Sequence, residues 1–419
     1  MKYRAIKGTK DILPNDVGSW QLVEGAVHRV MRDFNYKELR TPIFEQTALF
    51  ARSIGELTDI VSKEMYTFTD RGNESVTLRP EGTAAALRAY IQNNLSDQSP
   101  LTKVYYLGPM FRQERPQAGR LRQFHQFGAE ALGGSSPLLD VEMMLLPMEI
   151  YRQLGVATFS LKVNSVGCDR CRPPYKEFLR TELLKIQRQL SADCQARIHN
   201  NPLRVLDSKD ANDRRLTANA PLIKDHLCEE CKSHFTEVQR LLDTLQTVYE
   251  IDGRLVRGLD YYTKTAFEIT STALGSQDAL AGGGRYDLLV EELGGKPTPG
   301  VGFAAGIERL LMVLEKISGS LRADSGPVLF VVALDDASRR WTFAKATELR
   351  SKGAAVELDY LGRSVKAQMR EANRQNAQYV LVVGESELAS RSAKLKNMQT
   401  GYETPVSLDN FTLPIHSPA

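Results

Sequence analysis

The sequence predicts a protein of mixed α and β structure whose first domain is strand-rich, interrupted by a mostly helical insertion and followed by a small α/β domain. Strand-like segments punctuated by polar residues run from Met65 to Leu132 and resume near Leu255. Between them, from about Asn164 to Thr247, helical patterns dominate and every cysteine is found. In the C-terminal part, short apolar runs alternate with helical patterns, which is typical of an α/β domain with a largely parallel sheet.

Length and composition limit the possible classes of protein. The 419 residues, 42% of them hydrophobic, can bury a large core and divide into two or three domains. With 54 basic and 51 acidic residues, net charge neither demands nor excludes a nucleic-acid partner. No signal-peptide pattern or bilayer-length apolar run is found, so we expect a cytoplasmic protein without membrane contact. Five cysteines, an odd number, argue against a disulfide framework.

The first predicted elements are a helix and a short strand. Apolar residues recur at helical spacing from Trp20 to Phe34, and the segment from Tyr36 to Pro42 resembles a strand closed by proline. These two elements precede the segments that carry candidate functional residues.

The next segment, Thr77 to Arg88, is an extended piece that runs into a helix beginning near Pro80. Glu81 and Thr83 therefore lie at a helix N-terminus, where backbone N–H groups remain free. Helix capping alone could account for Thr83. The Glu81 carboxylate, in contrast, suits a pocket that binds an ammonium group.

Two strands joined by a loop follow, from Lys103 to Glu130. In the second strand, the period of two places one set of side chains on a single face, where they suit a flat base beside a small polar substrate. This set is Arg122, Phe124, Gln126, Gly128 and Glu130. His125 falls on the opposite face, and we interpret it as structural.

Arginines are dense around the loop between these strands, which suggests a polyphosphate ligand. Arg112 and Glu114 share a face of the first strand, and the loop adds Arg115, Gln117 and Arg120. We therefore expect this loop to reach the same site.

A run of charge, glycine and paired aromatics from Arg257 to Thr263 favours the wall of a polar pocket. The guanidinium of Arg257 suits a carboxylate or phosphate. If the segment is extended, Tyr261 and Tyr262 point to opposite faces, so only one lines the pocket. The alternative is a turn that enters a strand, with Asp260 as its cap.

The segment from Pro299 to Leu314 is interpreted as a glycine-rich turn into a helix, with Arg309 near its beginning. We reject a dinucleotide-binding fingerprint here because no apolar strand precedes the turn. A linker from Ser318 to Pro327 then leads to the C-terminal domain. Its predicted elements are strands at 328–333, 355–358 and 379–383 and a helix at 364–376.

Four of the cysteines form two C-x-x-C pairs, Cys168 with Cys171 and Cys228 with Cys231. This spacing is that of a four-thiolate zinc site, and the pairs lie near opposite ends of the insertion. Cys194 is left out. The alternative is four reduced, partly buried thiols without an ion, and the sequence leaves both interpretations open.

Three segments together resemble the motifs of class II aminoacyl-tRNA synthetases: a strand ending in proline, F-R-x-E before the arginine-rich loop, and a G-x-E-R helix. Four further segments resemble the histidyl-tRNA synthetase family, and the similarity covers essentially the whole chain. The seven segments are Leu39–Pro42, Phe111–Glu114, Gly306–Arg309, Lys7–Pro14, Leu78–Thr83, Arg257–Tyr262 and Gly283–Asp287.

The resemblance implies an α+β catalytic domain built on an antiparallel sheet, spanning residues 1–322 and interrupted by an insertion at 168–247. Residues 327–419 would form an α/β anticodon-binding domain. It also implies a homodimer that joins L-histidine to tRNA(His), with ATP as substrate and Mg²⁺ as its ion.

The resemblance assigns roles to the residues already singled out. Arg112 and Arg257 would act at the α-phosphate, and Arg115 and Gln117 would meet the tRNA acceptor end. Histidine would be bound by Glu81, Thr83, Arg112, Gln126, Glu130, Arg257, Tyr261 and Tyr262. ATP would be bound by Arg112, Glu114, Arg120, Phe124 and Arg309.

Two alternatives share the resemblance. One is a catalytically silent regulatory subunit of ATP phosphoribosyltransferase, but such chains typically lack the anticodon module and the intact segment from Arg257 to Tyr262. The other is a synthetase of the same subclass for another amino acid, which should not combine Glu130 with the tyrosine pair.

Overall fold

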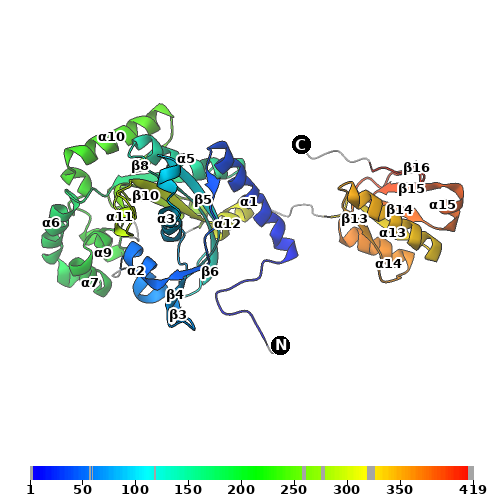
Figure 1. Ribbon diagram of the computed structural model, residues 1–419, viewed down its shortest axis with the longest axis horizontal. Helices are drawn as coiled ribbons and strands as arrows, with labels where there is room; N and C mark the ends of the chain where they lie inside the picture. The colour runs from blue at the N-terminus through cyan, green and yellow to red at the C-terminus, as the bar shows by residue number, and fades with distance from the viewer. Residues whose placement is uncertain are drawn as a thin grey trace. The chain divides into compact units, whose positions relative to one another are not determined.

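In the computed structural model the chain forms two compact units, Met1–Leu321 and Arg322–Ala419. The structure describes residues 3–55, 58, 60–117, 119–256, 261–274, 279–318 and 326–413. Each unit has its own sheet and hydrophobic core (Figure 1). Within these described ranges, no helix combines the length and the apolar character needed to cross a membrane.

The first unit is built on an eight-stranded sheet in the order β1-β5-β6-β11-β10-β9-β7-β8. The six central strands pair antiparallel, and each edge strand runs parallel to its neighbour. The prediction that the first domain is built on an antiparallel sheet is therefore confirmed. In sheet order, the strands are β1 (Lys37–Glu38), β5 (Thr102–Phe111), β6 (Gln123–Leu132), β11 (Gly300–Gly306), β10 (Ala279–Arg285), β9 (Thr263–Thr270), β7 (Ser160–Ser165) and β8 (Tyr249–Ile251).

Four helices cover one face of this sheet with an apolar layer. Alternate residues of β6, namely Phe127, Ala129 and Ala131, are fully buried in the same cluster as Phe303 and Ala305 of β11. The side chains of the intervening residues of β6 point to the opposite face of the sheet, as the predicted period of two requires. The covering helices are α1 (Pro14–Asp33), α5 (Pro137–Gln153), α10 (Glu229–Thr244) and α12 (Ile307–Ser318).

Smaller elements complete the first unit. The predicted strand at 36–42 is confined to β1, although the N–H of Leu39 still donates to the Tyr105 carbonyl of β5 at 2.8 Å. A three-stranded antiparallel sheet has the order β2-β4-β3. These elements are β2 (Phe44–Gln46), α2 (Thr47–Ile54), the π-helix η1 (Ile60–Glu64), β3 (Tyr66–Thr69), β4 (Ser75–Leu78), α3 (Thr83–Gln92), α4 (Leu95–Gln98), η4 (Thr272–Leu274) and α11 (Leu289–Glu292).

Between β7 and β8 the chain is helical, and its short helices share a small core. Leu179, Ile198 and Val205, from three of these helices, are fully buried in one cluster. Helices α6 and α7 pack together in the green part of Figure 1. The elements are α6 (Arg172–Leu184), η2 (Gln187–Gln189), α7 (Ala192–Asn200), α8 (Leu203–Leu206), α9 (Ala211–Leu216), η3 (Ile223–His226) and α10, which returns to the sheet.

The glycine-rich segment before α12 is a central strand, so its interpretation as a turn is wrong. β11 spans Gly300–Gly306 and pairs with both β6 and β10. A Cβ added at Gly302 would lie 1.7 Å from Oε2 of Glu130. Glycine is therefore required here to leave room for a buried carboxylate on the neighbouring strand, and not to make a turn.

The second unit contains a five-stranded sheet in the order β13-β12-β14-β15-β16. Only β13, β12 and β14 are parallel, so the expected largely parallel sheet is in fact mixed. The connections to β15 and β16 are too short for parallel crossovers, which need about a dozen residues. The elements are β12 (Leu329–Ala333), α13 (Asp336–Ser351), β13 (Val356–Leu358), α14 (Val365–Arg374), β14 (Tyr379–Val383), α15 (Glu385–Ser390), β15 (Ser392–Asn397) and β16 (Glu403–Ser407).

A buried ion pair joins the sheet to α5. Arg285, at the end of β10, and Asp140 of α5 both have fully buried side chains and form a bidentate contact. His234 of α10 contacts the same carboxylate at 3.2 Å. Burial alone would raise the pKa of Asp140, but the hydrogen bond from His234 and the charge of Arg285 hold it below its usual range. The packing of β10, α5 and α10 against one another therefore relies on the carboxylate of Asp140.

We predict that Arg285→Met lowers the free energy of unfolding of the first unit by about 3–5 kcal/mol, because it leaves Asp140 buried without its main counter-charge. The chain has two tryptophans, Trp20 and Trp341. Urea unfolding followed by fluorescence in a Trp341→Phe background therefore reports on the first unit alone.

The matched control is Arg240→Met, which removes the exposed pair with Glu237. It should change stability by less than about 0.5 kcal/mol. Equal effects of the two substitutions would contradict the importance given to the buried pair.

Candidate functional site

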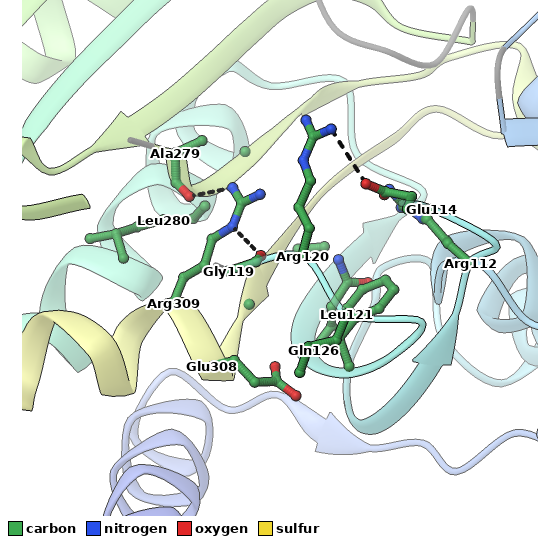
Figure 2. Close-up of a pocket in the computed structure, with 15 residues that line it drawn as sticks. Arg112, Glu114, Gly119, Arg120, Leu121, Gln126, Ala279, Leu280, Glu308 and Arg309 are labelled. Atoms are coloured by element: carbon green, nitrogen blue, oxygen red, sulfur yellow. Dashed lines mark hydrogen bonds and ion pairs between the residues drawn. The ribbon is translucent and has the colours of Figure 1, made fainter. Parts of the chain in front are cut away.

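A cavity of about 200 Å³ lies between the ends of β6, β10 and β11 and the loop that joins β5 to β6 (Figure 2). The five residues predicted to bind ATP all line it, and so does Gln126 from the predicted histidine set. The five are Arg112, Glu114, Arg120, Phe124 and Arg309. The structure therefore brings together residues that lie almost two hundred positions apart in the sequence.

Three guanidinium groups and two carboxylates line the cavity, and two of the guanidinium groups lie near Glu114. Nη1 of Arg120 lies 3.4 Å and Nη1 of Arg112 lies 3.7 Å from the carboxylate oxygens of Glu114. Arg309 donates to the carbonyls of Gly119 at 3.2 Å and Ala279 at 2.8 Å. Burial and the neighbouring positive charge of Arg120 lower the pKa of Arg309. Such a surplus of positive charge favours a bound polyanion.

An aromatic ring beside the arginines offers a surface for a planar group. The guanidinium carbon of Arg112 lies 5.3 Å from the ring centroid of Phe124. Nε of Arg112 also donates to the Pro80 carbonyl at 2.9 Å, which ties the cavity to the segment that precedes α3. One arginine thus contacts both the aromatic surface and the neighbouring helix start.

The loop between β5 and β6 carries the two residues predicted to meet the tRNA acceptor end. Arg115 and Gln117 are both exposed. The backbones of Gln117 and Arg120 form an isolated antiparallel bridge, with hydrogen bonds of 3.0 and 2.9 Å. The loop therefore presents its outer side chains to solvent and directs Arg120 toward the cavity.

Farther along β6, Glu130 is fully buried and surrounded by hydroxyl groups. Thr83 of α3 donates to its Oε1 at 2.8 Å, and Tyr106 of β5 donates to the same atom at 3.2 Å. The hydroxyl of Tyr286 donates to Oε2. Burial raises the pKa of Glu130 to about 8, even though these donors oppose the shift. The three hydroxyl donors therefore stabilise a carboxylate that burial alone would disfavour.

A second buried carboxylate, Glu81, lies at the start of α3. Its oxygens accept from the backbone N–H groups of Thr83 at 2.6 Å and Ala84 at 2.8 Å. Burial raises the pKa of Glu81, while these backbone hydrogen bonds and the charge of Arg112 oppose the rise. Glu81 thus caps the helix, and each oxygen keeps a lone pair for a further donor.

The rings of the two tyrosines of the predicted pocket wall pack against each other. The prediction that only one of them lines the pocket assumed an extended segment. The ring centroids of Tyr261 and Tyr262 are 4.7 Å apart, and Tyr261 also packs edge-on against Tyr286 at 5.6 Å. The strand β9 begins only at Thr263, so the extended geometry behind the expectation does not apply. Arg257 and Asp260 lie outside the described residues.

Gln126 and His125 lie on opposite faces of β6, as predicted. Oε1 of Gln126 is shielded from solvent and has no hydrogen-bond partner, although the residue lines the cavity. His125 contacts Glu308 of α12 at 3.0 Å and packs edge-on against Trp20. An acceptor without a donor in a polar cavity is the signature expected of a group that meets a ligand.

The four cysteines of the predicted metal site also come together. The Sγ atoms of Cys168, Cys171, Cys228 and Cys231 all lie within 4.8 Å of one another. The set could hold a zinc ion, since four thiolates are a common zinc ligand set. Cys194 is separate and buried in the helical core.

Residues 8–310 match the family model described as histidyl-tRNA synthetase, and residues 329–413 match that of the anticodon binding domain. The chain belongs to the histidyl-tRNA synthetase family. The histidine–tRNA ligase of Halothermothrix orenii is 48% identical over 411 residues, covering 98% of each chain.

Solved structures agree with this membership. The apo histidyl-tRNA synthetase of S. aureus is 40% identical, with a TM-score of 0.83 over 97% of this chain and 98% of that one. A Bacillus halodurans structure titled ATP phosphoribosyltransferase regulatory subunit/histidyl-tRNA synthetase is 20% identical, with a TM-score of 0.65 over 92% and 99% of the two chains. That second likeness concerns the fold alone.

Sequence reasoning missed three residues around Glu130, namely Tyr106, Tyr286 and Gly302. Tyr286 lies within the family segment Gly283–Asp287, which had been singled out without a role for its tyrosine. Tyr106 is the antiparallel partner of Gly128, and a Cβ at Gly128 would lie 2.6 Å from the Tyr106 hydroxyl oxygen. A glycine next to a predicted buried carboxylate is the signal that could have revealed a facing side chain.

The raised pKa of Glu130 predicts a specific pH dependence of stability. A carboxyl group that keeps its proton more tightly when folded stabilises the fold fully below its unfolded pKa, near 4.5, and this contribution is lost as pH rises through about 8. Compared with Glu130→Gln, the wild-type protein should therefore lose stability between pH 5 and pH 9. This loss of stability should be at most a few kcal/mol, since a shift of one pKa unit corresponds to about 1.4 kcal/mol.

Urea unfolding of both proteins in the Trp341→Phe background, at intervals across this pH range, measures the difference directly. A difference in unfolding free energy that does not change with pH would show that the Glu130 pKa is not raised.

Proposed function

We propose that this protein is a histidine–tRNA ligase that activates L-histidine with ATP and transfers the histidyl group to the 3′ end of tRNA(His). The observation that carries the proposal is that the buried Glu130 lies on the same strand, β6, as Phe124 and Gln126, which line the arginine-lined cavity, in a chain that matches the family over both domains. Glu130 suits an imidazole, and the arginines suit the phosphates of ATP.

In the first step, a histidine carboxylate oxygen attacks the α-phosphate of ATP, the bond between the α- and β-phosphates breaks, and pyrophosphate leaves. Little acid–base chemistry is needed, because such transfers depend mainly on positioning and charge stabilisation. The ribose hydroxyl of the terminal tRNA nucleotide then takes the histidyl group, and AMP leaves.

The histidine side of the site divides into two groups of residues. Glu81, Thr83 and Gln126 would hold the α-ammonium group, because two carboxylate oxygens and an unpartnered amide oxygen are available as acceptors. Glu130 and Tyr262 would contact the two imidazole nitrogens, with Tyr261 packed against Tyr262. A pocket that pairs both ring nitrogens would reject apolar isosteres by roughly 10⁴-fold.

The proposed ATP-binding part of the site consists mainly of the arginines around the cavity. Arg112 and Arg257 would neutralise charge at the α-phosphate and meet the histidine carboxylate, and Arg120 and Arg309 would bind the outer phosphates. Phe124 would stack on adenine, and Glu114 would contact its edge. Mg²⁺ would enter with ATP, held mainly by phosphate oxygens and water, and would neutralise the leaving pyrophosphate.

The remaining parts of the chain would serve tRNA. Arg115 and Gln117 are proposed to contact the acceptor end, because both are exposed on the loop above the cavity. Residues 1–322, interrupted by 168–247, are proposed as the catalytic domain and 327–419 as the domain that holds the anticodon. Two linked contacts raise the effective concentration of the acceptor end at the site.

The alternative function, a regulatory subunit of ATP phosphoribosyltransferase, is disfavoured by the anticodon module at 329–413 and by the intact arginine-lined cavity. ATP–pyrophosphate exchange with each of the common amino acids separates the two. Exchange with histidine alone supports the ligase. Its absence with every amino acid would favour the regulatory subunit.

Substitution of Glu130 by Gln should lower kcat/KM for histidine in this exchange by about 10- to 100-fold, because the carboxylate that accepts from an imidazole N–H becomes a neutral amide, which accepts more weakly and has a donor in place of one of the two acceptor oxygens. The dissociation constant for ATP should stay within about twofold. Glu250→Gln, an exposed carboxylate on the edge strand β8, is the matched control and should behave as wild type. An unchanged histidine KM in Glu130→Gln would refute the assignment.

A homodimer is proposed from the family resemblance, with the segment 39–42 near the interface. Multi-angle light scattering of the purified protein should give twice the mass of one chain. A single-chain mass at the concentration used for the exchange assay would refute the dimer.

A further inference from the structure

The four clustered cysteines lie at the beginning and the end of the helical segment between β7 and β8. Cys168 and Cys171 directly precede α6, while Cys228 precedes α10 and Cys231 lies in its first turn. The Sγ atom of Cys168 is 3.7 Å from that of Cys171 and 3.7 Å from that of Cys228. The Sγ atoms of Cys171 and Cys231 are 3.8 Å apart.

These separations match a tetrahedral metal site and not a disulfide. A disulfide joins two sulfurs at about 2.0 Å. A zinc–thiolate bond is about 2.3 Å long, and the edge of a regular tetrahedron is about 1.6 times the distance from its centre to a corner, so bound sulfurs lie about 3.8 Å apart. The three short sulfur–sulfur distances have this value, and the remaining pairs stay within 4.8 Å.

The local backbone supports negative charge on the sulfurs. The N–H of Cys168 lies 3.2 Å from the Sγ of Cys171. Cys171 and Cys228 are the N-caps of α6 and α10, so both pairs lie at positive helix ends. Gly167 has a φ of +69°, and a Cβ there would lie 2.8 Å from the Sγ of Cys171. Four thiolates with one Zn²⁺ leave a net charge of −2, which the helix ends partly offset.

Each cysteine pair has a neighbour that holds the segment after the pocket tyrosines. Arg172, next to Cys171, donates to the backbone carbonyl of Tyr262. Glu230, between Cys228 and Cys231, lies 3.0 Å from Nζ of Lys264, which also pairs with Asp287 at 3.2 Å. The backbone closes the link, since the N–H of Lys264 donates to Gly167 at 2.8 Å.

Lys264 itself is a strained position. Its φ of +49° is in the left-handed region, which a lysine adopts only when its surroundings hold it there. Its side chain is only 13% exposed. The conformation directly after Tyr262 and Thr263 therefore depends on contacts made from both cysteine pairs.

We propose that Cys168, Cys171, Cys228 and Cys231 bind one structural Zn²⁺ and that this site, through Arg172 and Glu230, positions Tyr261 and Tyr262 in the histidine pocket. The ion has no open coordination position and takes no part in the chemistry. It holds α6 and α10 together so that both contacts to the segment 262–264 persist. The second half of the proposal depends on the proposed ligase function, whereas the first half does not.

The metal is tested on the full-length protein purified without chelator. Elemental analysis should find about one equivalent of zinc per chain, and 4-hydroxymercuribenzoate should release it to a chromogenic zinc indicator. Cys231→Ser should lose the zinc, while Cys194→Ser, a buried cysteine outside the cluster, should keep it. Less than about a tenth of an equivalent of zinc in the wild-type protein, or iron in its place, would overturn the site, whether or not Cys231→Ser folds.

The link to the histidine pocket is tested without touching the metal ligands. Glu230→Gln should keep its zinc and raise the histidine KM in ATP–pyrophosphate exchange by about fivefold, with the ATP KM and kcat within about twofold. The matched control is Glu229→Gln, an exposed carboxylate in the same turn of α10, which should leave all three values unchanged.

A zinc-loaded Glu230→Gln protein with an unchanged histidine KM would overturn the link. Failure of the wild-type protein to exchange with histidine at all would refute the ligase function instead, while leaving the zinc result intact.

Discussion

The site depends on one constraint: a carboxylate, Glu130, is buried in the middle of an antiparallel sheet. A charge in that position needs space and hydrogen-bond donors, since burial without them costs several kcal/mol. Gly302 on β11 provides the space for the carboxylate, Gly128 on β6 leaves room for the Tyr106 hydroxyl, and three hydroxyl groups provide the donors. The glycine at position 302 follows from this requirement.

The same sheet separates two kinds of charge. Carboxyl groups collect toward α3, where Glu81 and Glu130 are both buried and both have raised pKa values. Guanidinium groups lie around the loop between β5 and β6, where burial and the charge of Arg120 lower the pKa of Arg309. Each group is unfavourable alone, and each is relieved by a ligand of opposite charge. A substrate that is cationic at one end and polyanionic at the other would satisfy both.

Much of this arrangement could be predicted from the sequence because it depends on local periodicity. The alternation along β6 separates Gln126 and Glu130 from the apolar Phe127, and the positions of Glu81 and Thr83 at a helix start follow from the proline and glycine around them. The closeness of Arg309 in α12 to Arg120 in the loop between β5 and β6 could not be predicted from either segment alone. The two arginines were assigned to one site because both segments resemble motifs of one family.

What the sequence could not give were features decided by packing between distant strands. The segment at 300–306 has the composition of a turn, yet it forms a strand paired with β6, where Gly302 makes room for Glu130. The backbone two residues after Tyr262 has a positive φ at Lys264, a conformation that is uncommon for lysine and that the sequence pattern does not indicate. Tyr286 went unassigned because its role exists only through its partner on β6.

The closeness of Cys168 and Cys231 has a consequence for how the chain can change in length. The segment between the cysteine pairs leaves and returns at nearly the same point, so it behaves as a closed loop fastened at its base. Closing such a loop becomes only slightly less favourable as residues are added. The outer helices α7 and α8 can therefore change in length without separating the cysteine pairs, as long as α6 keeps Arg172 in contact with Tyr262 at the base of the loop.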